Sequence, residues 1–192
     1  MTEEFQRPRP PHDIAFARAL IFFGLIFWLT YAPGRIYAQP SAHSNSIIGE
    51  GSAGLFFGEA FGGGTANIGI VFERHGLRYS ARYVHQADSR APELSPVQPS
   101  KIDVMREASI LIGLVYYDGA GVYSGNAGLG WTWGNYLFPP SSSTFGSASI
   151  CLEAYGGVEL AKALRVGLHA RANINGVRST GAINATIGVH FN

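Results

Sequence analysis

The 192-residue chain is poor in cysteine, in lysine and in charge of either sign. Its single cysteine, Cys151, excludes a disulfide within the chain and lies too far from the N-terminus to be a lipoprotein attachment site. Charged residues make up 14% of the sequence, lysine occurs only at positions 101 and 162, and the formal net charge is +1. Proteins that bind nucleic acid usually carry an excess of positive charge, and this chain does not. We therefore expect no nucleic-acid partner.

Long amphipathic helical patterns are also missing beyond the N-terminal region. The sequence is instead rich in glycine, with 25 residues, and contains 12% aromatic residues. Glycine is common in tight turns, and aromatic residues are enriched in strands. This composition favours a single all-β domain with many turns.

The N-terminal region has the pattern of an export signal. Arg7, Arg9 and Arg18 precede an apolar run of 11 residues, 19–29, which suits a signal peptide and is too short to span a bilayer. The small residue Ala38 offers a cleavage position, although an uncleaved anchor is the alternative. The predicted organisation is a signal peptide, a flexible lead-in and a β-barrel, over residues 1–38, 39–46 and 47–192.

Eight later segments show the alternation of apolar and polar residues that is typical of strands. Without a helix between them, neighbouring strands are expected to pair antiparallel. The loops 88–105 and 137–147 are long, whereas the turns at 75–76, 118–121 and 161–163 are short. Such a difference is typical of transmembrane barrels. The predicted strands cover residues 47–60, 65–74, 77–86, 106–117, 122–136, 148–160, 164–174 and 180–192.

Two kinds of closed barrel fit eight such strands. A soluble, lipocalin-like barrel buries its apolar face, whereas a membrane barrel turns that face toward lipid. Lipid is favoured because the apolar face is nearly free of charge and the polar face carries charges that can pair. The sequence therefore predicts an all-β, eight-stranded antiparallel up-and-down transmembrane β-barrel, with the soluble carrier as the alternative. Aromatic residues near the strand ends are predicted to form its girdles: Tyr116, Tyr123, Trp131, Trp133 and Tyr136.

The last strand carries apolar residues at every second position up to the penultimate residue, Phe191. This pattern resembles the C-terminal strand of bacterial outer-membrane proteins, which the barrel assembly machinery recognises and which usually ends on the aromatic residue itself. Over residues 47–192 the chain resembles the small eight-stranded barrels of the OmpA/OmpX type. The resemblance implies a place in the bacterial outer membrane, contact with its lipid, and an assembly signal that includes Ile187, Val189 and Phe191.

Pairing the strands about the predicted turns brings charged residues opposite one another on the polar face. Across the turn at 161–163 the predicted pairs are Glu159–Arg165, Tyr155–His169 and Glu153–Arg171. Across the loop at 175–180 they are Arg171–Asn184, His169–Thr186 and Arg165–His190, and across the turn at 75–76 the pair is Glu73–Arg78.

Buried charges require partners, and an eight-stranded barrel is just wide enough for side chains to fill. We therefore expect these residues to seal the lumen, with a narrow gated pore or a site for a small polar ligand as alternatives. The predicted interior polar network contains Glu73, Arg78, Arg82, Glu153, Glu159, Arg165, His169, Arg171, Asn184 and His190.

Support for an enzyme is weak. Nucleophilic catalysis requires a nucleophile within reach of an oriented base, and the best set is His169 with Glu153 and Ser149. His169 is predicted to face inward, away from lipid, and no metal-ligand spacing is evident. We therefore predict no catalytic residues, no metal and no cofactor. Three hypotheses remain: a structural or surface-interaction barrel that binds a surface ligand through loops 88–105 and 137–147, a lipid-modifying enzyme, and a lipocalin-like carrier.

Overall fold

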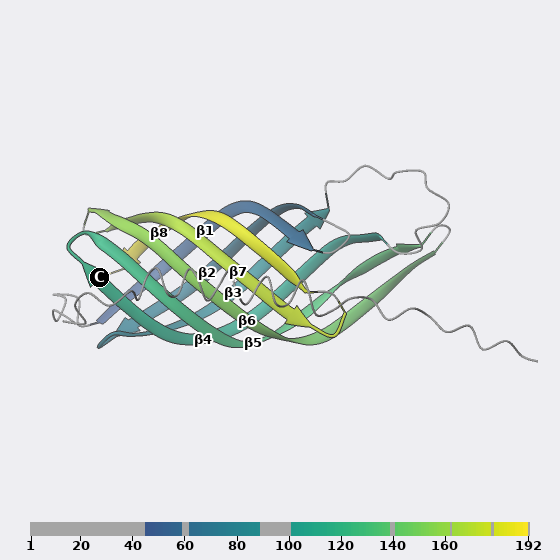
Figure 1. Cartoon of the computed structure of the whole chain (residues 1–192), viewed down its shortest axis with the longest axis horizontal. Helices are drawn as coiled ribbons and strands as arrows, with labels where there is room; N and C mark the ends of the chain where they lie inside the picture. Colours follow the sequence, from purple (N-terminus) through teal and green to yellow (C-terminus); the bar gives the residue numbers. More distant parts are fainter. Residues whose placement is uncertain are drawn as a thin grey trace, which may run out of the picture.

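The structure is a computed structural model that describes residues 45–58, 62–88, 101–138, 141–161, 163–177 and 179–191, without the side chains of 101–103, 136–138 and 141–143. The described residues form eight strands that close into a barrel in sequence order, with every neighbouring pair antiparallel and β8 pairing with β1 (Figure 1). The predicted fold is thus confirmed. The strands are β1 Asn45–Gly58, β2 Gly62–Arg74, β3 Leu77–Asp88, β4 Lys101–Asp118, β5 Gly121–Phe138, β6 Ser141–Ala161, β7 Leu164–Asn175 and β8 Thr180–Phe191.

The N-terminal predictions can be compared with the structure only in part. The predicted signal peptide, 1–38, and residues 39–44 of the predicted lead-in lie outside the described residues. Asn45 and Ser46, also predicted as lead-in, are instead the first residues of β1. The part of the chain that the structure describes contains no helix that is long and apolar enough to cross a membrane.

The barrel is apolar outside and charged inside. Ile110, Leu129 and Leu168 on the outer face are 74%, 72% and 63% exposed, whereas the interior side chains of Arg78 and Arg165 are fully buried. A lipocalin-like carrier would have the opposite arrangement, so the soluble alternative is not supported. Outward apolar side chains and an inward polar face are the arrangement of a barrel that lies in lipid.

The interior is not polar throughout. Phe56, Met105 and Ala182 form a buried apolar cluster near the long-loop end, with Phe145 packed against it. A second cluster lies near the β4–β5 turn and contains Val115, Val122, Tyr155 and the partly buried Tyr117. Apolar and charged side chains therefore share the lumen, an arrangement that the sequence pattern did not predict.

The predicted loops 88–105 and 137–147 were too long. β4 begins at Lys101, which pairs with Leu137 near the end of β5, and β6 begins at Ser141, which pairs with Phe138 at the end of β5. The extensions lack the apolar alternation that identifies a lipid-facing strand, so only their backbone pairing reveals them. As a result β4, β5 and β6 together extend beyond their outer neighbours β3 and β7, as Figure 1 shows at the end opposite the C-terminus.

The predicted registers were correct for two hairpins and wrong for a third. Glu73 lies opposite Arg78 across a turn in which His75 and Gly76 have φ values of 50° and 78°, and Glu153 lies opposite Arg171. Between β7 and β8 the true register differs by two residues from the predicted one. Arg171 lies opposite Ala182 instead of Asn184, His169 opposite Asn184 instead of Thr186, and Arg165 opposite Gly188 instead of His190.

Candidate functional site

The candidate site is the network of charged side chains that fills the lumen. Near the short-turn end, two arginines share the carboxylate of Glu73. Arg78 donates to Glu73 at 2.7 Å and to Glu50 at 2.7 Å, while Arg165 donates to Glu73 at 2.9 Å and to Glu159 at 3.0 Å. Five strands therefore contribute to this group: β1, β2, β3, β6 and β7.

Tyr117 connects β4 to the same group. Its hydroxyl donates to Glu73 and accepts a hydrogen bond of 3.0 Å from Arg165. The Arg165 guanidinium also lies 5.7 Å from the centre of the Tyr117 ring. Through Tyr117, the apolar cluster near the β4–β5 turn is thus hydrogen-bonded directly to these ion pairs.

The middle of the lumen is organised around Glu153. Arg82 donates to it at 3.1 Å from β3, and Arg171 donates at 2.9 Å from the neighbouring strand β7. His169 Nε2 lies 3.3 Å from the Glu153 Oε2 atom. Because Arg82 also donates to Glu50 at 2.7 Å, it links this group to the group around Glu73.

A third group lies toward the long-loop end and is centred on Glu107. Arg171 and Asn173 both donate to this carboxylate, and the Cys151 thiol donates to it at 2.9 Å. Asn173 also donates to Thr132 at 3.0 Å. Arg171 thus belongs to two groups, because its other donor atom is bonded to Glu153.

The network brings together most of the predicted interior residues and adds others that were not predicted, among them Cys151, Asn173 and Thr132. His190 Nε2 lies 3.5 Å from Glu159, and Asn184 is 1% exposed. Glu50, Glu107 and Tyr117 were missed. They lie on β1 and β4, whose interior faces also carry apolar residues and therefore show no simple alternation. Among the described side chains, the ion pairs of the network involve five glutamates and four arginines: Glu50, Glu73, Glu107, Glu153, Glu159, Arg78, Arg82, Arg165 and Arg171.

The aromatic residues that were predicted as girdles lie toward the two ends of the barrel. Tyr116 and Tyr123 are directly opposite each other beside the β4–β5 turn, and Trp131 and Trp133 lie on β5 toward the long loops. The side chain of Tyr136 is outside the described ones. All four described side chains share the outer face with the aliphatic residues.

The predicted assembly signal lies on the outer face of β8. Ile187, Val189 and Phe191 are 58%, 43% and 59% exposed. The Phe191 ring also reaches across the closing seam to β1, where a β-carbon added to Gly49 would lie only 2.9 Å from it. Phe191 therefore packs on the neighbouring strand as well as facing outward.

The candidate catalytic set is not assembled. His169 contacts Glu153, but the hydroxyl of Ser149 lies 3.7 Å from the Cys151 sulfur. Within the described ranges, no hydrogen bond joins Ser149 to His169, and no three histidine, cysteine or acidic residues are placed to hold a metal. The geometry of the interior is that of mutually neutralised charges.

Comparison with solved structures identifies the fold. Neisserial surface protein A is similar over 77% of this chain and 97% of its own, with a TM-score of 0.61 and 11% identity. The fold is that of the small eight-stranded outer-membrane barrels. The N-terminal β-barrel domain of Pseudomonas aeruginosa OprF aligns with 76% of this chain and 97% of its own (TM-score 0.59, 9% identity). The barrel Ail of Yersinia pestis, an attachment invasion locus protein, aligns with 77% and 99% (TM-score 0.52, 13% identity). No protein-family model and no curated protein sequence matches this chain.

Proposed function

We propose that the chain is a structural or surface-interaction barrel of the bacterial outer membrane, with a lumen that does not conduct. The observation that carries this proposal is the bond from Arg82 on β3 to Glu153 on β6, which crosses the lumen between strands that are not neighbours. Ion flow requires a continuous aqueous path, and here charged side chains meet across the middle of the barrel. The apolar clusters around Phe56 and Val122 lie at either side of this bond.

The outer face supports the location. Between its ends the barrel presents aliphatic side chains, and aromatic residues lie toward each end, as expected for an apolar band about 25 Å tall. We propose that Ile187, Val189 and Phe191 act as the assembly signal of this barrel, and that residues 1–38 direct its export. Mass spectrometry of the membrane-embedded protein should find a mature N-terminus near Gln39, and an intact Met1 would contradict the export proposal.

The extended strands support a role at the cell surface. Barrels of this kind place short turns in the periplasm and longer connections outside the cell. The end of β5 and the start of β6 project on the long-connection side, so they would stand above the membrane. We propose that this side, including the predicted loop regions 88–105 and 137–147, is where a surface ligand would bind.

Two measurements test the proposal. Cell fractionation should place the mature protein in the outer membrane, with the heat-modifiable electrophoretic mobility of a stable barrel. Refolded into planar lipid bilayers, the protein should give no conductance steps, whereas Arg82→Ala combined with Glu153→Ala should allow ion leakage. A steady open pore in the unmodified protein would contradict the sealed lumen, and recovery in the periplasmic soluble fraction would contradict the location.

A further inference from the structure

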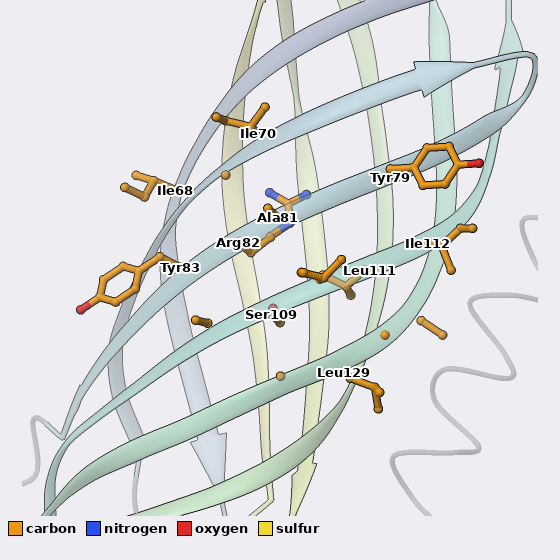
Figure 2. Close-up of a pocket in the computed structure, with 16 residues that line it drawn as sticks. Ile68, Ile70, Tyr79, Ala81, Arg82, Tyr83, Ser109, Leu111, Ile112 and Leu129 are labelled. Atoms are coloured by element: carbon orange, nitrogen blue, oxygen red, sulfur yellow. The ribbon is translucent and has the colours of Figure 1, made fainter.

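A shallow groove of about 1000 Å³ runs over the outer face of β2 to β5 (Figure 2). Small side chains form its floor, and Figure 2 shows Tyr79 and Tyr83 at its two ends. Arg82, Ser109 and Leu111 border the groove but are buried on the interior side of the wall. The floor is formed by Ala81, Ala108 and Ala127, and the sides by Ile68, Ile70, Ile110, Ile112 and Leu129.

A row of basic and aromatic side chains lies at the long-loop end of this groove. Arg106 on β4 lies directly opposite His85 on β3 and directly opposite Trp133 on β5. Two residues further along each strand, on the same outer face, Tyr83 lies opposite Ala108, and both belong to the groove. The basic row and the groove are therefore continuous on one face of the barrel.

Arg106 has no ion-pair partner within the described part of the chain. Its side chain is partly exposed on the outer face, unlike the four interior arginines. The other described charges on the outer face, Arg74 and Asp118, lie at the short turns on the opposite side of the membrane. An arginine at the edge of an apolar band calls for an anionic partner, and the described protein residues supply none.

The depth of Arg106 matches a lipid headgroup. Arg106 lies twelve positions before Asp118 at the β4–β5 turn. At about 3.3 Å per residue and a strand tilt of about 40°, Arg106 lies roughly 30 Å from that turn along the barrel axis. The apolar band of such barrels is about 25 Å tall, so the guanidinium reaches the outer interface while the groove lies within the band.

We propose that the groove and the row of Arg106, His85 and Trp133 bind a phosphorylated lipid of the outer leaflet. Arg106 forms a forked, charge-assisted pair with a lipid phosphate, and His85 and the indole N–H of Trp133 add donors. An acyl chain of the same lipid lies over Ala81 and Ala108, between the larger side chains. The proposal rests on the outer-membrane location proposed above and adds a specific ligand to it.

Native mass spectrometry of the refolded full barrel tests the charge requirement, with diphosphoryl lipid A as the probe. Arg106→Gln should weaken binding about tenfold, because a charge-assisted pair is lost. Arg74→Gln is the matched control, since Arg74 is also an outward arginine but lies at the opposite rim, and it should bind like the unmodified protein. Fully dephosphorylated lipid A should bind equally weakly to all three proteins.

A second pair of variants tests the groove. Ala108→Leu fills the floor beside Tyr83 and should reduce binding of the same probe severalfold without unfolding the barrel. Ala170→Leu, on the outer face of β7 and remote from the groove, is the control and should have no effect. Both variants add the same side chain to a strand face that already carries leucine.

The outcomes separate this inference from the proposed function. Equal binding by Arg106→Gln and the unmodified barrel, equal losses in Arg106→Gln and Arg74→Gln, or undiminished binding of dephosphorylated lipid A would each overturn the lipid site while leaving the outer-membrane barrel intact. No effect of Ala108→Leu would overturn the placement of the acyl chain in the groove. Failure of the unmodified protein to refold as a heat-modifiable barrel would instead overturn the proposed function, and the lipid site with it.

Discussion

Arg82 and Glu153 meet in the middle of the lumen, although their strands, β3 and β6, are three positions apart in the ring. We predict that Arg82→Met lowers the free energy of unfolding by about 3 kcal/mol, because it deprives two buried carboxylates of one partner each. Arg74→Met, at an exposed position at the end of β2, should change stability by no more than about 0.5 kcal/mol. Urea unfolding of the two variants in lipid vesicles measures the difference, and equal stabilities would show that the central bond contributes nothing.

Glu153 and Arg171 are predicted to be energetically coupled. Each also has other partners, since Glu153 is bonded to Arg82 and Arg171 is bonded to Glu107. Alanine at either position leaves a buried charge less well paired, whereas alanine at both removes the mutual bond once. A double-mutant cycle on the refolded barrel should therefore give a double variant that is less destabilised than the sum of the singles. Additive losses would mean that the 2.9 Å bond is energetically silent.

Arginine substitutions at two depths can test whether the outer face of β7 contacts lipid. Leu168→Arg places a charge on the outer face about 10 Å deeper than Leu164→Arg does on the same face of the same strand, at about 3.3 Å per residue and a tilt of about 40°. Arginine near the midplane of a barrel costs about 2–4 kcal/mol, falling to about 0–1 kcal/mol near the interface. Assembly yield in the outer membrane should fall sharply for Leu168→Arg and little for Leu164→Arg. Similar yields for the two variants would contradict the proposed membrane position.

The seam between β1 and β8 is predicted to depend on a glycine. Gly49→Val brings a side chain into the ring of Phe191, whereas Gly51→Val, on the same face of the same strand, meets nothing within 4 Å. We expect Gly49→Val to destabilise the barrel by about 1–3 kcal/mol through overpacking and to slow refolding. Gly51→Val should be neutral or stabilising, because valine suits strands. Thermal shifts of gel mobility compare the two, and indistinguishable transitions would show that Phe191 moves away at no cost.

The sequence predicted the strands inside the membrane band because lipid imposes a strict alternation there. It predicted the β6–β7 register because the turn around Ala161 and Leu164 is short and leaves little freedom. The β7–β8 register was missed by two residues because the connection there is longer. A shift of two keeps every side chain on the same face, so hydrophobic alternation cannot distinguish the two registers.

The alternation of apolar and polar residues could not predict the contacts across the lumen, for a different reason. Neighbouring pairs such as Glu73 and Arg78 follow from a hairpin, but Arg82–Glu153 depends on how the whole ring curves. Glu107 was missed because the interior face of β4 also carries Met105 and Leu111, which hide its parity. The extensions of β4 and β6 were missed because their residues do not alternate between apolar and polar.

The placement of the charges by strand has a consequence for how the barrel forms. All four arginines of the network lie on β3 and β7, which stand on opposite sides of the ring, and the five glutamates lie on β1, β2, β4 and β6. Taken hairpin by hairpin, β1–β2 and β5–β6 each carry two of the negative charges, β3–β4 carries two positive and one negative, and β7–β8 carries two positive. The β6–β7 hairpin balances its own charges, because Glu153 and Glu159 pair with Arg171 and Arg165. Glu50 on β1 and Glu107 on β4 are instead paired only by arginines of strands that are not their neighbours, β3 and β7, so these two carboxylates gain partners only as the ring comes together. We infer that half-assembled forms are penalised electrostatically and that closure of the ring is an all-or-none step.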